Sequence, residues 1–121
     1  MLPKFSHQSY TNLGEALLNL QEQVRAKDLE IDGLRTRFEQ VQQVFEQEIM
    51  GVTLEDLDSS AIALQQSAKT EIHRMLRLLG TDLLFLQSSR QAGTTQQRLQ
   101  KISDRLEQLI SYCQGLVEIT L

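Results

Sequence analysis

The side chains best suited to metal binding or nucleophilic catalysis are few: two histidines, His7 and His73, and one cysteine, Cys113. A carboxylate-bridged di-iron site in a helical bundle needs a glutamate three residues before a histidine, so that both project from one helix face. Glu71 precedes His73 by two residues and therefore lies on a different face. This spacing argues against a di-iron site and predicts that His73 lies at the flank or surface of a helix.

Other catalytic signatures are also missing from the sequence. It has no Gly-rich phosphate loop and no Gly-x-Ser-x-Gly motif. Cys113 falls on an apolar helical seam, which predicts a buried and unreactive thiol. As a lone cysteine it cannot form an intramolecular disulfide, which fits a reducing cytoplasm. We therefore expect no enzymatic activity, no cofactor and no bound metal.

The elements that would position these side chains are helices. The 121 residues suit one domain, 40% of them are hydrophobic, and the single proline is Pro3. Four stretches carry helical periodicity and none carries the alternation of a strand. The sequence thus predicts a single all-α domain over residues 1–121, with helices at about 5–27, 29–50, 54–90 and 95–118.

Short connections between these helices make sequence neighbours antiparallel, which predicts an up-down four-helix bundle with a long third helix. The apolar steps of three and four in the first helix form a heptad seam: Tyr10, Leu13, Leu17, Leu20 and Val24. Asp28 is the predicted N-cap of the second helix and Gly51 its left-handed C-cap. One uninterrupted helix over residues 5–50 remains an alternative.

Charge is unevenly distributed, although the net charge is only −4. No basic residue occurs between Arg37 and Lys69, a gap that holds six acidic residues. From Lys69 to Arg105, seven basic residues face three acidic ones. Either the two segments pack against each other as antiparallel helices, or they form patches of opposite sign that orient a partner.

The third helix has more apolar residues between positions 75 and 86 than one core-facing stripe can use. At 100° per residue, Leu84 points about 150° and Phe85 about 110° away from the core direction. The candidate partner-binding residues on this outer side are two arginines and three apolar side chains: Arg74, Arg77, Leu78, Leu84 and Phe85.

Two interpretations of this apolar excess stay open. Exposed apolar clusters mark interfaces, and aromatic residues with arginine are the favoured types at their centres. Such an interface would serve a homodimer or a different protein. Alternatively, the helix is central and buried all round.

Nucleic acids and membranes are not expected partners. Arg98, Lys101 and Arg105 share one face of the fourth helix and could follow phosphates, but a solvated outer face suits a mildly acidic chain better. No aromatic residues interleave with these charges to stack on bases. No apolar run approaches the ~18 residues of a membrane helix, and no signal peptide is visible. We therefore expect a soluble, cytoplasmic protein without membrane insertion.

Three runs of sequence resemble one protein family: FEQVQQVFEQEI from Phe38, TEIHRMLRLLGTDLLFLQSSR from Thr70, and QQRLQKISDRLEQLISYCQGL from Gln96. They are similar to the PatD family, the heterocyst-frequency control proteins of filamentous cyanobacteria. The resemblance implies a cytoplasmic regulator of heterocyst differentiation that acts by protein–protein interaction, with the division protein FtsZ as partner. It assigns no role to individual residues. The alternative is a structural scaffold that self-associates through its heptad seams as a coiled coil.

Overall fold

The computed structural model describes residues 4–26, 28–51, 59–89 and 91–119. This part of the chain contains helices and no strand, which confirms the predicted all-α fold. The elements are α1 (Lys4–Arg25), α2 (Ile31–Val44), α3 (Ser59–Ser88) and α4 (Ala92–Ile119). A π-helical segment, η1 (Phe45–Met50), continues α2 without a break.

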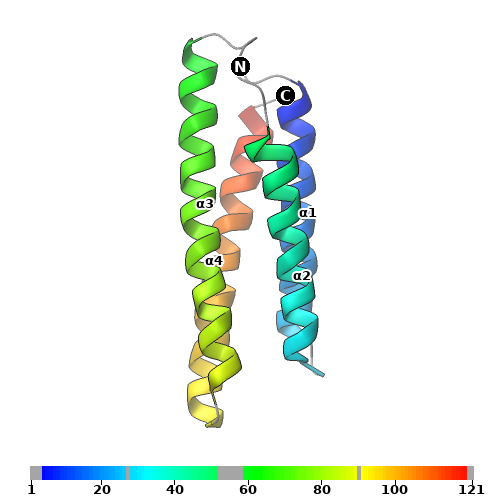
Figure 1. Cartoon of the computed structure of the whole chain (residues 1–121), viewed down its shortest axis with the longest axis vertical. Coiled ribbons are helices and arrows are strands. Elements are labelled where there is room, and N and C mark those ends of the chain that lie inside the picture. Colours follow the sequence, from blue (N-terminus) through cyan, green and yellow to red (C-terminus); the bar gives the residue numbers. More distant parts are fainter. Residues whose placement is uncertain (1–3, 27, 52–58, 90, 120–121) are drawn as a thin grey trace.

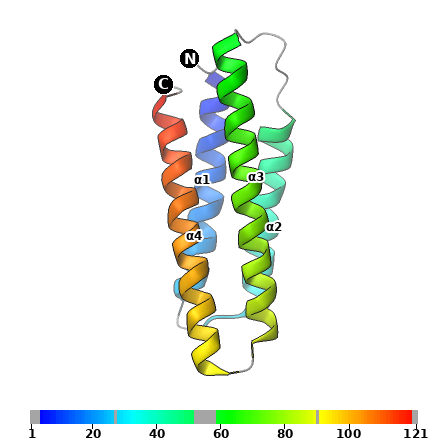
Figure 2. The ribbon, with the colours of Figure 1, turned by 90° about the vertical axis from the view of Figure 1, so that its left-hand side faces the viewer.

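The helices form an up-down bundle, as the short connections predict (Figure 1). Successive helices run in opposite directions, α1 and α2 lie together, and α3 lies beside α4 (Figures 1 and 2). With 30 residues, α3 is the longest element, which confirms the predicted long third helix. Its first turns extend beyond the end of η1 (Figure 1).

The predicted seams form the core. All five seam residues of α1 are buried, four of them completely, and they pack with apolar residues of the other helices. One buried polar contact joins α1 to α3: the Tyr10 hydroxyl donates a hydrogen bond of 2.7 Å to Oε1 of Gln65. Since Gln65 is only 1% exposed, this bond satisfies polar groups that water cannot reach.

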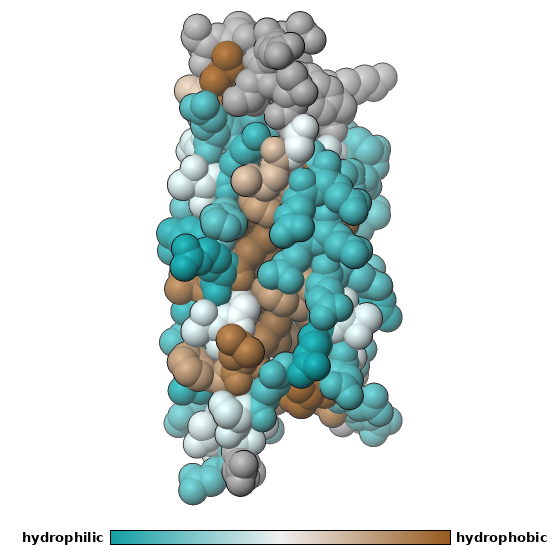
Figure 3. All heavy atoms as spheres, viewed as in Figure 1, coloured by the Kyte–Doolittle hydropathy of each residue, from teal (hydrophilic) through white to brown (hydrophobic). Residues whose placement is uncertain are grey.

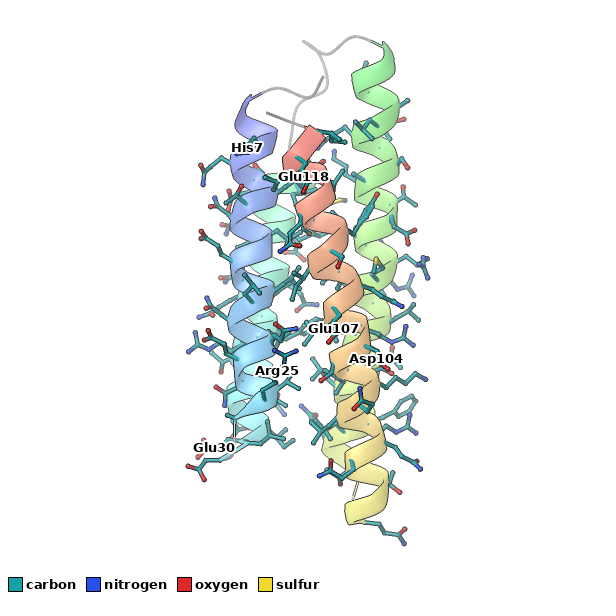
Figure 4. All side chains as sticks on the ribbon, turned by 180° about the vertical axis from the view of Figure 1, so that it is seen from behind. His7, Arg25, Glu30, Asp104, Glu107 and Glu118 are labelled. Atoms are coloured by element: carbon teal, nitrogen blue, oxygen red, sulfur yellow. The ribbon has the colours of Figure 1, made fainter. Side chains whose placement is uncertain are left out.

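The far side of the bundle is closed by α1 and α4 (Figure 4). Arg25 on α1 and Glu107 on α4 form an ion pair of 3.6 Å there, and both side chains are more than half exposed. Near the chain ends, His7 Nδ1 lies 3.2 Å from the Val117 carbonyl oxygen. His7 therefore has a structural contact that ties α1 to α4.

The break between the first two helices is real, so the alternative of one long helix is wrong. The residue before α2 is Glu30, in an extended conformation (φ −116°, ψ 131°) and without a side-chain cap. Asp28 is therefore not the N-cap. Extended backbone at Glu30 interrupts the helical hydrogen bonds and lets Ile31 start α2 in the opposite direction.

Gly51 does not form the predicted left-handed C-cap. Its dihedral angles are φ −81° and ψ 0°, and no glycine in the described residues has a positive φ. The wider π-helical turn of η1, with hydrogen bonds that span five residues, ends this helix instead. It keeps both Phe45 and Ile49 in the core.

The ends of the last two helices also differ from the prediction. The predicted start of α3, residues 54–58, lies outside the described residues. At its other end, the Ser88 and Ser89 hydroxyls donate to carbonyls of the preceding turn, and the helix stops at Ser88 rather than near residue 90. Helix α4 begins before the predicted residue 95, because the Thr95 N–H already donates to the Gln91 carbonyl at 2.9 Å.

Candidate protein-interaction surface

The side of α3 that faces α4 is closed by a buried ion pair. Asp82 on α3 is 3% exposed, and Arg105 Nε on α4 donates a hydrogen bond to its Oδ2. A carboxylate at this depth needs such a partner, because burial of an unpaired charge is costly. The pair therefore fixes how α4 lies along α3.

Further along the same seam, Arg98 of α4 covers Phe85 of α3. The Arg98 guanidinium carbon lies 4.6 Å from the ring centroid, within the range of a cation–π contact. Phe85 nevertheless remains 47% exposed. Arginine thus holds part of the ring in place while much of it stays open to a partner.

This finding corrects the prediction for the basic face of α4. Of the three residues expected on a solvated outer face, Arg98 and Arg105 are half-buried and contact α3, and Lys101 is exposed. The stripe lies at the edge of the α3–α4 interface, where Phe85 and Asp82 provide partners. The spacing alone could not reveal this, because it shows which residues share a face but not what that face meets.

Two more predicted residues belong to the α4 side of α3. Arg74 donates hydrogen bonds to both carboxylate oxygens of Glu71, of 3.3 Å from Nε and 2.6 Å from Nη2. These bonds lower the pKa of Glu71. Leu78 is half-buried and lies one heptad before Phe85, on the same face. We call Arg74, Leu78, Phe85 and Arg98 the α3–α4 patch.

The side of α3 that faces α2 is open. Two adjoining hollows of about 260 and 310 Å³ lie between α3 and the α2–η1 segment, and Gly80 lines both. Figure 3 shows them as part of a hydrophobic band between two polar margins. A Cβ atom at Gly80 would lie 3.2 Å from the Phe38 ring, so the missing side chain allows the two helices to approach here. We call this feature the α2–α3 groove.

Leu84 and Arg77 lie on this groove rather than on the α3–α4 patch. Leu84 is 64% exposed and lines the first hollow, and Arg77 lines the second. Leu84 and Phe85 are neighbours in sequence, but about 100° of helical rotation turns one towards α2 and the other towards α4. The five predicted residues therefore belong to two surfaces, not to one cluster, and the alternative that α3 is buried all round is wrong.

Arg98 is the residue of the α3–α4 patch that was not predicted as a site residue. A usable signal exists in the short connection between α3 and α4. In an antiparallel pair, residues at similar distances from the connection lie side by side, and Phe85 and Arg98 meet this condition to within one helical turn.

The side chains with potential chemistry stay apart in the fold. His73 is exposed on α3 and stacks on Phe45, with ring centroids 6.0 Å apart, as the flank prediction requires. Cys113 is 1% exposed, which confirms the predicted buried thiol. Within residues 4–26, 28–51, 59–89 and 91–119, no three His, Cys, Asp or Glu side chains group as metal ligands. No helix in the same ranges has the length and apolarity to cross a bilayer.

Buried titratable groups predict a loss of stability in alkali. Burial raises the pKa of Cys113 from an ordinary value of 9.0 to about 12, and burial also raises the pKa of Tyr10. Above about pH 9 the unfolded thiol loses its proton while the folded thiol keeps it. The unfolded state then binds fewer protons, so the free energy of unfolding falls as the pH rises towards 12.

Urea unfolding at several pH values above and below 9 measures this fall. The variant Cys113→Val is the control, because it lacks the thiol and should lose part of the alkaline dependence. In addition, a thiol reagent should modify native Cys113 far more slowly than it modifies the unfolded chain. Equal rates for both states would show that the thiol is accessible.

Comparisons with known proteins give no match: neither a protein-family model, nor a curated protein, nor a solved structure corresponds to this chain.

Proposed function

We propose that this protein is a non-enzymatic regulator that acts by binding another protein through the α3–α4 patch. The observation that carries the proposal is Phe85, a 47% exposed aromatic ring that an arginine from a second helix holds in place. Aromatic and arginine side chains are enriched among residues that dominate binding energies. A ring already restrained by Arg98 also loses less conformational freedom on binding.

The charges around the patch suit a partner with acidic groups beside an apolar pocket. Arg98 and Lys101 lie on α4 without an acidic ion-pair partner among the described residues, whereas Arg74 is neutralised by Glu71. Positive charge beside an exposed ring speeds the approach of an acidic surface and fixes its orientation.

The resemblance to the PatD family supplies the biological context of the proposal. It makes the protein a cytoplasmic regulator of how many cells become heterocysts, with FtsZ as the partner. The support consists of the three sequence runs that resemble the family, and of a surface suited to protein binding. Two of these runs, from Thr70 and from Gln96, contain the residues of the α3–α4 patch.

The alternative of an open coiled-coil scaffold has less support. Such a scaffold would need free heptad seams, but the seam residues of α1 are buried in the chain's own core, together with Ile102, Leu106 and Leu109 of α4. Association through the outer surfaces of the bundle uses the observed exposed residues instead. A scaffold would show a mass that rises steadily with concentration, whereas a regulator of this kind should form particles of fixed size.

A binding experiment with purified FtsZ tests the proposal. Phe85→Gln and Arg98→Gln should each weaken binding, the first by at least about tenfold, as expected for a central aromatic residue. Neither change should alter the thermal midpoint much, because both side chains are at least partly exposed.

The matched control is Leu18→Gln, which changes a 42% exposed apolar residue on α1. This variant should bind FtsZ as tightly as the wild type. If folded Phe85→Gln binds with unchanged affinity, the α3–α4 patch is not the docking site. If the wild type does not bind FtsZ at all, this choice of partner is wrong.

A further inference from the structure

We propose that the α2–α3 groove is the contact surface between two copies of this chain, packed face to face about a two-fold axis parallel to the groove. This inference goes beyond the proposed function and does not depend on it. It concerns the side of α3 away from the α3–α4 patch, and it can be tested with the protein alone.

The shape and polarity of the groove indicate a protein contact. Among the exposed large hydrophobic residues of the described chain, the two most exposed are Leu84 at 64% and Met50 at 50%. Leu84 lines one hollow of the groove and Met50 lines the other. Figure 3 shows a hydrophobic band along this side of the bundle. A continuous apolar surface with polar margins is typical of an association site.

At the second hollow of the groove, the two walls carry opposite charges. Glu46 lines the second hollow from the α2–η1 wall, and Asp32 and Glu39 precede it in the sequence at heptad spacing. His73 and Arg77 line the same hollow from the α3 wall, and Lys69 precedes His73 by four residues in the sequence. The α2–η1 wall also carries one basic residue, Arg35, which lines the first hollow. No ion pair in the described part of the chain joins the two walls.

A two-fold axis parallel to the groove brings walls of opposite charge together. Such an axis places the α3 wall of one copy opposite the α2–η1 wall of the other, at the same height. Glu46 and Arg77 line the same hollow, so each would face its counterpart of opposite charge in the second copy. A two-fold axis across the groove would instead set basic α3 against basic α3, which charge repulsion disfavours.

The same argument selects a second copy over an unrelated helix. An unrelated partner would have to present both signs of charge at this separation, whereas a second copy does so by symmetry. Two-fold dimers are also the commonest form of oligomer. The face is about 30 Å long along α2 and η1 and about 20 Å wide across two helices, or about 600 Å². This area is close to the roughly 800 Å² per partner of a stable complex.

Mass measurement of the full chain in solution tests the dimer. At micromolar concentration the wild type should have twice the chain mass of 13.8 kDa. Leu84→Lys places a charge in the apolar contact and should return the mass to 13.8 kDa. The control Leu18→Lys, on α1, should remain dimeric, and both variants should keep the helical circular dichroism of the wild type.

Charge reversal tests the symmetry. Glu46→Arg and Arg77→Glu should each weaken the dimer by at least about tenfold, because each places like charges opposite one another. The double variant restores opposite charges across the two-fold axis and should recover most of the lost affinity.

Two results would overturn the proposal: a wild type that has a mass of 13.8 kDa over the whole micromolar range, and a Leu84→Lys variant that stays dimeric. Failure of the double variant to recover affinity overturns the two-fold arrangement.

Discussion

Replacing Arg105 with methionine is expected to lower the free energy of unfolding by about 3–5 kcal/mol at neutral pH. The reason is Asp82, which is 3% exposed on α3 and receives the Arg105 hydrogen bond from α4. Without the guanidinium, the folded chain must hold a carboxylate that neither water nor a cation stabilises. Urea unfolding of the purified variant measures the loss.

A double-mutant cycle separates the cost of an unpaired charge from the value of the pair. Asp82→Leu should cost less than Arg105→Met, because Arg105 is 24% exposed and its charge can turn to water. The double variant Asp82→Leu, Arg105→Met should be close to the wild type, since two apolar side chains can replace a buried ion pair. A double variant as unstable as Arg105→Met alone would show that the pair matters for another reason, such as packing.

Leu79→Ala is expected to destabilise the protein by about 2–5 kcal/mol. Leu79 is fully buried near the middle of α3, and its loss leaves a cavity between this helix and its neighbours. Thermal or urea unfolding with a fixed protein concentration measures the effect. A fixed concentration is needed because association stabilises the folded state by mass action.

The control for this prediction is Leu18→Ala, which removes the same atoms from a leucine that is 42% exposed. Its cost should stay below about 1 kcal/mol, since little transfer energy and no enclosed cavity are involved. Similar costs for the two variants would contradict the assignment of Leu79 to the core face of α3.

The fold was largely predictable because its main determinant is periodic. The heptad steps of α1, from Tyr10 to Val24, specify one buried face whatever the neighbours are, and this face is buried. Helix ends were less predictable because single hydrogen bonds decide them. Gly51 ends a π-helical turn that no residue type signals, and the Thr95 N–H extends α4 towards Gln91.

The candidate surface was predictable only in part, for a geometric reason. Rotation at 100° per residue correctly placed Leu84 and Phe85 outside the core, because that needs only the helix itself. Whether two outward residues share a surface depends on the helices beside them. With α2 on one side and α4 on the other, Leu84 lines a groove while Phe85 lies beneath Arg98.

Asp82 illustrates the same limit. By residue type it resembles an exposed polar position, but it follows Leu79 by three residues and precedes Leu86 by four, which places it near the core face of α3. The sequence does not show which side chain pairs with its carboxylate, and this is Arg105, 23 residues later, on the helix that covers it. Pairings of this kind depend on the relative rotation of two helices, which the periodicity of each helix alone does not determine.

The central claim is that two neighbouring side chains serve two surfaces: Leu84 a second copy of the chain, and Phe85 a different protein. The most direct test measures, for Leu84→Lys and Phe85→Gln, both the mass in solution and the affinity for unpolymerised FtsZ. We predict that Leu84→Lys is monomeric and still binds FtsZ, whereas Phe85→Gln is dimeric and binds it at least about tenfold more weakly. Loss of both properties in either folded variant would contradict the claim, because it would show that the two residues belong to one surface.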